Sequence, residues 1–225
     1  MTNKERFIEL LRSTKREGIE KLIDFLEKTD FFTAPASTRF HMSCEGGLLQ
    51  HSLNVYDCLV NLGTTTGDVQ EFHVAGMRLD SIPKESIIIV ALLHDLCKVN
   101  FYATEMRWRK DANNKWEQYP VYAVNDRNPY GHGEKSVMMA SEFIRLTMEE
   151  RYAIRWHMGM SEANITQTYC QAAEKYPLVL FAHMADQMAT SYLETNTGNK
   201  KPEDVYLGTE PAVQDPEKFA EAEPI

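Results

Sequence analysis

The stretch Ile87-Ile88-Ile89-Val90-Ala91-Leu92-Leu93-His94-Asp95-Leu96-Cys97-Lys98 carries seven consecutive apolar residues directly before a histidine and an aspartate. Its β-branched residues would suit a strand. Its length and its continuation through Lys98 favour a central helix over 85–98 that is buried on all sides. Buried titratable groups need a partner, and a divalent metal binds imidazole and carboxylate together. The pair His94-Asp95 is therefore a candidate for metal binding.

Four more titratable residues lie among apolar helix-forming residues: His51, His132, His157 and Asp186. Taken singly, each has an ordinary explanation, because most buried polar side chains are simply hydrogen-bonded. Together, four histidines and two aspartates would suit two metals of borderline softness with one carboxylate between them. The residues lie 43, 37, 25 and 29 positions apart along the chain, so no short ligand motif links them.

The order His51, His94-Asp95, His132, His157, Asp186 resembles that of the HD-domain superfamily of metal-dependent phosphohydrolases. Three strings are similar to the HD part of YhaM-type 3′-to-5′ exoribonucleases: Gly46-Gly47-Leu48-Leu49-Gln50-His51-Ser52-Leu53, Leu92-Leu93-His94-Asp95-Leu96-Cys97-Lys98 and His183-Met184-Ala185-Asp186-Gln187-Met188. The resemblance covers about residues 38–195. It implies an all-α fold, an HD-domain helical bundle, here with a small inserted β-hairpin.

The resemblance also implies a ligand set. His51, His94, Asp95 and Asp186 would hold a first divalent ion, and Asp95 would bridge to a second ion completed by His132 and His157. The ions would be two of Mn, Fe, Ni, Zn or Mg. The implied activity is hydrolysis of a phosphoester, as a phosphomonoesterase or phosphodiesterase, through a metal-activated water. The substrate would be a nucleotide or another small phosphorylated molecule.

Two alternatives remain open. Diiron oxygenases of the HD fold, such as myo-inositol oxygenase, use the same ordered ligands and act on small polar substrates; the similarity to YhaM-type strings favours the hydrolase. A regulatory HD module without turnover is weakened by the complete ligand set. YhaM-type enzymes carry an OB-like domain before the HD part, whereas about 40 residues with a helical pattern stand here. That difference argues against long RNA substrates.

Further residues are expected around the centre. Lys98, three residues after Asp95, is expected to orient Asp95 or a phosphate oxygen, which makes Asp95 and Lys98 the candidate catalytic pair. Arg39, His41, Lys135 and Arg155 are candidate substrate-binding residues, with a solvated surface role as the alternative for each. His183, one helical turn before Asp186, is expected to support the ligands from behind.

Three segments are expected along the chain. Residues 1–37 form N-terminal helices that pack on the core, with a break at Gly18, and residues 38–196 form the HD domain. Within it, aromatic and β-branched residues on both sides of Asp111-Ala112-Asn113-Asn114 predict a hairpin over about 101–123. The small and polar residues of 63–83 predict a loop with at most a short helix. Residues 197–225 are expected to be an acidic, flexible tail.

The chain has 225 residues, with 24 basic and 33 acidic side chains, for a net charge of −9. Residues 202–225 hold seven acids and one lysine, so −6 of this charge belongs to them. The balance argues against duplex DNA as a partner but leaves a phosphorylated substrate possible if metals supply positive charge.

No apolar run is long enough for a membrane span, no signal-peptide pattern precedes the first helix, and four widely spaced cysteines are expected to be reduced thiols. These features predict a cytoplasmic protein, for which a homodimer is possible.

Overall fold

The computed structural model describes residues 1–160 and 166–194 of the chain. The elements in order are α1 Asn3–Ser13, α2 Ile19–Lys28, α3 Gly47–Asn61, β1 Thr64–Thr66, β2 Val69–Val74, β3 Met77–Pro83, α4 Lys84–Leu93, the short 3₁₀ turn η1 Leu96–Lys98, β4 Tyr102–Lys110, β5 Trp116–Val124, α5 His132–Ser141, α6 Met148–Arg155, α7 Thr166–Lys175, α8 Pro177–Met188 and the π-helical turn η2 Ala189–Leu193. The tail predicted for 197–225 lies outside the described residues.

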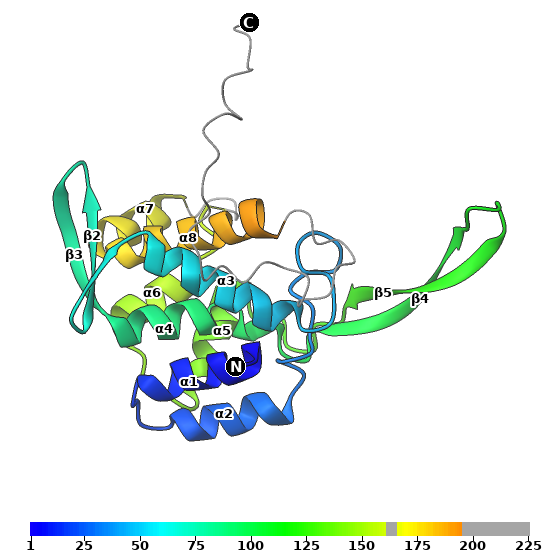
Figure 1. Ribbon diagram of the computed structural model, residues 1–225, viewed down its shortest axis with the longest axis horizontal. Coiled ribbons are helices and arrows are strands. Elements are labelled where there is room, and N and C mark those ends of the chain that lie inside the picture. The colour runs from blue at the N-terminus through cyan, green and yellow to red at the C-terminus, as the bar shows by residue number, and fades with distance from the viewer. Residues whose placement is uncertain (161–165, 195–225) are drawn as a thin grey trace, which may run out of the picture.

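The helices surround α4, which contains the apolar run of residues 87–93. Residues 86–93 of α4 are all buried, and the helix contacts α1, α3 and α6. Figure 1 shows α1 and α2 on one side of α3 and α4, with α7 and α8 on the other. The break at Gly18 is confirmed: this residue has a positive φ and separates α1 from α2. No helix in the described part of the chain is long and apolar enough to cross a membrane.

The expectation of an all-α fold is only approximately right, because residues 63–83 form a small sheet and not a loop. Strands β1, β2 and β3 pair antiparallel in that order. The turn between β2 and β3 has positive φ at both Ala75 and Gly76, the pattern that closes tight hairpins. The sheet is attached to the core through Phe72, whose ring stacks on Phe181 of α8 at a centroid distance of 4.2 Å. This contact joins residues far apart in sequence, so the local composition gave no sign of it.

The central helix is shorter than expected. It ends at Leu93, and Asp95, with φ −103° and ψ 19°, interrupts the helical backbone before η1. The ring of His94 helps to end the helix, since its Nδ1 lies 2.8 Å from the carbonyl oxygen of Ala91. In a continuous α-helix, consecutive side chains point about 100° apart. The interruption lets the neighbours His94 and Asp95 reach the same site.

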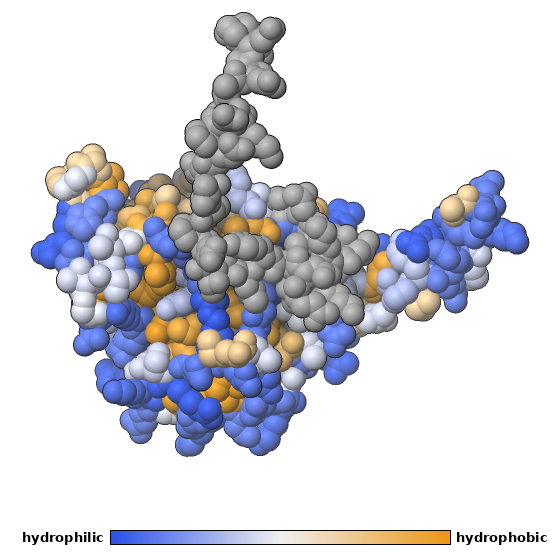
Figure 2. Space-filling model, viewed as in Figure 1, coloured by the Kyte–Doolittle hydropathy of each residue, from blue (hydrophilic) through white to orange (hydrophobic). Residues whose placement is uncertain are grey.

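The predicted hairpin is confirmed. Strands β4 and β5 pair in register from Tyr102 opposite Val124 to Lys110 opposite Trp116. Figure 1 shows this pair, hereafter the arm (residues 102–124), extending far from the helical body, and Figure 2 shows its surface standing clear of it. The arm contacts the helical body at its base. There, the hydroxyl of Tyr102 donates a hydrogen bond to the carbonyl oxygen of Ala36.

One half-buried acid makes the stability of this fold depend on pH. Burial and the nearby charge of Asp80 raise the pKa of Glu149, in the first turn of α6, from 4.5 to about 7. Its Oε1 is buried and has no hydrogen-bond partner among the described residues. The folded chain therefore holds a proton that the unfolded chain releases near pH 4.5, and the fold loses stability as the pH rises from 4.5 through 7.

We predict that Glu149→Gln, which has no charge to bury, raises the midpoint of thermal unfolding by about 2–4 °C at pH 8 and leaves it unchanged at pH 4. Differential scanning calorimetry at both pH values measures this. Glu142→Gln, at an exposed position, is the matched control. Equal effects of Glu149→Gln at the two pH values would contradict the assignment.

Candidate metal centre

The structure brings together six side chains from five segments. His51 lies on α3, His94 and Asp95 follow α4, His132 begins α5, His157 follows α6, and Asp186 lies on α8. Two of these segments meet at Gly133: a Cβ on this residue would stand 2.2 Å from the carbonyl oxygen of Arg155. Only glycine allows α5 and the end of α6 to approach so closely, and this approach places His132 beside His157.

Asp95 is the common neighbour of two groups of candidate ligands. Its Oδ2 lies 3.4 Å from Nε2 of His51 and 3.5 Å from Nε2 of His94. Its Oδ1 lies 2.8 Å from Nε2 of His132 and 3.5 Å from Nε2 of His157. Asp186 joins the first group, because its Oδ1 lies 3.4 Å from Nε2 of His51. Each carboxylate oxygen of Asp95 thus faces a different pair of imidazoles.

The rings of three histidines are oriented from behind. Nδ1 of His94 faces the carbonyl oxygen of Ala91, and Nδ1 of His157 faces that of Ile154 at 2.7 Å. Nδ1 of His51 lies 3.1 Å from both carboxylate oxygens of Glu194. Since carbonyl and carboxylate oxygens only accept hydrogen bonds, the network assigns a proton to each Nδ1. The lone pairs on Nε2 therefore point into the site, as metal ligation requires.

These groups fit divalent metal ions. Nε2 of His51 and Nε2 of His94 face each other at 3.1 Å, so two lone pairs would repel here unless a metal ion or a proton lies between them. Nε2 of His157 is buried without a hydrogen-bond partner among the described residues. Atoms that share one ion at bond lengths near 2.0–2.2 Å stand roughly 3.0–3.6 Å apart. The contacts of Asp95 with His51, His94 and His157 fall in this range, whereas its contact with His132, at 2.8 Å, is a direct hydrogen bond. Imidazole nitrogens with carboxylate oxygens suit Mn, Fe, Ni or Zn better than Mg, which prefers oxygen.

The carboxylates of the site also favour binding of a cation. Burial alone would lower the pKa of His51, but the carboxylates of Glu194, Asp186 and Asp95 outweigh burial and raise this pKa to about 9. Burial likewise opposes ionisation of Asp95, yet Lys98 and the surrounding histidines hold the pKa of this carboxyl well below its usual range. The site therefore keeps its carboxylates ionised and holds a positive charge between them.

A chain of hydrogen bonds that the sequence did not predict lies behind His51. Glu194 is fully buried and accepts a hydrogen bond at 2.8 Å from Nδ2 of Asn54, one turn after His51 on α3. Asn54 in turn accepts one from Nε2 of Gln50, and Gln50 accepts one from Nδ2 of Asn3 on α1. The π-helical turn η2 brings Glu194 to this position. In the sequence, the polar Asn54 three positions after His51 was the one sign of this chain of hydrogen bonds. No sequence pattern indicated the π-helical turn η2 that positions Glu194.

An open cavity of about 420 Å³ gives access to the centre. Its walls include His51, Asp95, His132 and Asp186 together with Lys98 and His41, and Tyr102 and Val124 at the base of the arm close one side. Nζ of Lys98 lies 2.6 Å from Oδ2 of Asp95. Burial and the charges of His51 and Lys98 lower the pKa of His41 to about 4, so its ring is neutral. Lys98 and His41 thus both line this cavity, and their roles at the substrate stay predictions.

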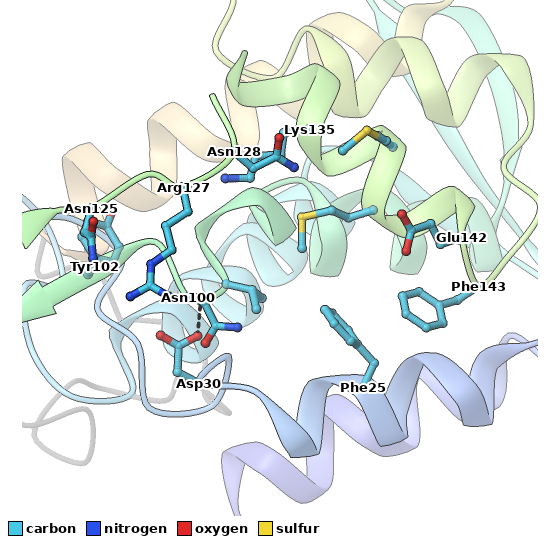
Figure 3. A pocket seen from close by; sticks show the side chains of 13 residues that line it. Phe25, Asp30, Asn100, Tyr102, Asn125, Arg127, Asn128, Lys135, Glu142 and Phe143 are labelled. Carbon is cyan, nitrogen blue, oxygen red and sulfur yellow. Dashed lines mark hydrogen bonds between the residues drawn. The ribbon is translucent and has the colours of Figure 1, made fainter. Parts of the chain in front are cut away.

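The other predicted substrate-binding residues lie away from this cavity. Lys135 pairs with Asp126 at 2.7 Å and lines a separate cavity of about 580 Å³ (Figure 3). Arg155 pairs with Glu134 and lies over the ring of Trp156. Arg39 is exposed, with its guanidinium 5.0 Å from the centre of the Phe40 ring. Lys135 and Arg155 are drawn away by acidic partners of their own.

Two residues hold the ligands through other contacts. Nδ1 of His183 lies 2.7 Å from the carbonyl oxygen of His157, so His183 holds the backbone of a candidate ligand, in the supporting position expected for it. Sγ of Cys97 lies 3.2 Å from Nδ1 of His132 and takes the place that backbone carbonyls take behind His94 and His157. All four cysteines are free thiols, as predicted.

We predict that Glu194→Gln lowers the affinity for divalent metal by about ten- to a hundredfold, the usual effect of losing such support behind a ligand. Glutamine keeps the shape of the side chain but removes the charge that makes the His51 ring more basic. Isothermal titration of metal-stripped protein with Mn²⁺ measures the affinity, and Glu9→Gln, at an exposed position, serves as the control. Unchanged affinity in Glu194→Gln would show that the contact with His51 does not contribute to binding.

Comparison with known proteins places this site in a family. No curated protein and no solved structure matches the chain. The family model of the HD domain matches residues 48–191, a span that contains all six candidate ligands and more than half of the chain. Proteins with this domain are in general metal-dependent phosphohydrolases, and the clustered histidines and aspartates agree with that chemistry. The chain belongs to the HD-domain family.

Proposed function

We propose that this chain is a phosphohydrolase that uses two divalent metal ions to hydrolyse a phosphoester of a nucleotide or another small phosphorylated molecule. One observation carries the proposal: the two carboxylate oxygens of Asp95 face two separate pairs of imidazoles, His51 with His94 and His132 with His157. A carboxylate in this position is suited to bridging two ions. When bound, such ions make water acidic enough to supply a nucleophile near pH 7 and stabilise charge on phosphoryl oxygens.

Asp95 and Lys98 have separate roles in the proposed reaction. Asp95 holds both halves of the site at a fixed separation, while its contact with Lys98 keeps its carboxylate in one orientation. Burial opposes the charge of Lys98, but Asp95 outweighs it and raises the pKa of the amine. Lys98 therefore stays protonated and presents a cation to the cavity beside the centre, where a phosphate oxygen can bind.

The cavity favours a compact substrate. Its volume of about 420 Å³ lies at the lower end of the range for small-molecule sites. Phe40 and Tyr102 offer aromatic surface, and the neutral ring of His41 offers a hydrogen-bonding group. These features suit a phosphate attached to a small planar or polar group, such as a nucleoside.

A diiron oxygenase is the second candidate, since it would use the same donor atoms. Lys98 favours the hydrolase, because a buried cation beside the bridging carboxylate matches the charge of a phosphoryl group. The closer similarity to YhaM-type exoribonucleases and the cytoplasmic location remain predictions from the sequence.

The first test combines metal analysis with an assay. Protein purified without added metal is analysed for bound metals and assayed with Mn²⁺ or Ni²⁺ on bis-p-nitrophenyl phosphate and a panel of nucleotides. We predict hydrolysis that Asp95→Ala abolishes, because neither half of the site retains its shared oxygen ligand. Two irons per chain, the absorbance of an oxidised diiron centre and no hydrolysis would support the oxygenase instead.

Lys98→Met tests the role of the amine. Methionine fills a similar volume without charge, and we predict a fall in kcat/KM of about a hundredfold with the metal content unchanged. Lys135→Met is the matched control, because Lys135 is equally buried but lies outside the catalytic cavity. Loss of metal in Lys98→Met, or equal losses of activity in both variants, would contradict a role for Lys98 at the phosphoryl group.

A further inference from the structure

The arm (residues 102–124) presents a surface that the rest of the described chain leaves uncovered. Side chains on one face of it are apolar and largely exposed: Met106 at 55%, Trp108 at 61% and Trp116 at 63%. Two-stranded hairpins are marginally stable alone in water, and exposed apolar groups of this kind mark interaction surfaces. We therefore expect the arm to bind a partner.

The free edge of β4 is the part of the arm most open to pairing. The sheet has two strands, so β4 pairs with β5 on one edge only. Strand β5 contains Pro120, which has no N–H group and discourages pairing at an edge. Strand β4 runs through nine residues without a proline. A new strand would thus add beside β4.

We propose that the β4 edge pairs with the β4 edge of a second copy of this chain, antiparallel about a two-fold axis at Met106. A strand that meets its own copy about a two-fold axis is antiparallel to it, and the two arms then form one four-stranded sheet. Such a dimer is closed, because each β4 edge is used once. This proposal is independent of the activity proposed above.

The charges on β4 select this register. With the axis at Met106, Glu105 of each copy faces Arg107 of the other, which gives two pairs of opposite charge across the new ladder. Within one chain the same two side chains are only loosely paired, at 3.9 Å, and both are exposed. Arg109 is already neutralised by Glu117 at 2.6 Å. The cross-copy pairs therefore use the charges that the arm leaves available.

Neighbouring registers bring like charges together. An axis at Glu105 places that residue opposite itself, and an axis at Arg107 does the same for Arg107. An axis at Trp108 places Arg107 opposite Arg109. Like charges directly opposite each other destabilise a sheet, so the register centred on Met106 is favoured among these.

Charge also favours a second copy over a nucleic acid. Residues 102–124 carry four basic and three acidic side chains, for a net charge of +1, so the rest of the chain carries −10. An arm of this low charge on so acidic a body gives little attraction for phosphates.

To test the proposal, the oligomeric state of the full chain is measured by sedimentation velocity over a range of concentrations. We expect a dimer, and we expect Glu105→Arg or Arg107→Glu alone to weaken it at least about tenfold, since the axis applies each substitution twice. The double variant Glu105→Arg/Arg107→Glu should restore the dimer. Arg78→Glu, a charge reversal on the exposed strand β3, should leave it unchanged.

A cysteine scan checks the register independently. In a background with the exposed Cys170 replaced by serine, Met106→Cys should form a disulfide between copies under mild oxidation, because residue 106 faces itself. Thr104→Cys should not, since it faces Trp108 of the other copy. A monomer at every concentration, or a dimer that both charge reversals leave intact, would overturn the proposal. So would a monomer that binds a single-stranded oligonucleotide through Trp108 and Trp116.

Discussion

The buried carboxylate of Asp95 is the constraint on which the arrangement of this protein depends. It lies at the end of the most apolar helix of the chain, where an ionised group is costly unless it is compensated. Lys98 compensates it at 2.6 Å and His132 at 2.8 Å, and three further imidazoles stand within 3.5 Å of its oxygens. Five segments of the chain converge on this point, so the geometry of the helical domain and the chemistry of the site have one origin.

The same constraint explains two irregular stretches of backbone. The helix α4 ends early so that His94 and Asp95 both face the site, and the π-helical turn η2 brings Glu194 behind His51. π-Helical turns often occur at functional sites. In both places regular hydrogen bonding gives way to the positioning of one side chain. Hydrogen bonds behind each ring then hold the imidazoles with their Nε2 atoms facing the centre.

Local patterns in the sequence were sufficient for much of the fold. The apolar run through Leu93 predicted the central helix, and the turn at 111–114 predicted the hairpin of β4 and β5. The sheet of 63–83 was missed because its attachment depends on Phe72 meeting Phe181, a contact that no local pattern records. Some residues of the site could likewise be predicted from the sequence and others could not. Ordered histidines and aspartates indicated the centre, whereas Glu194 depends on an unusual turn, and Lys135 and Arg155 turn towards the acids Asp126 and Glu134.

The central claim is that Asp95 is shared between two ion-binding groups. Anomalous diffraction from crystals soaked in Mn²⁺ tests it most directly. We expect two peaks, one on each side of the Asp95 carboxylate and each about 2.0–2.2 Å from one of its oxygens, with His51 and His94 near the first and His132 and His157 near the second. A single peak, or two peaks that do not share Asp95, would contradict it.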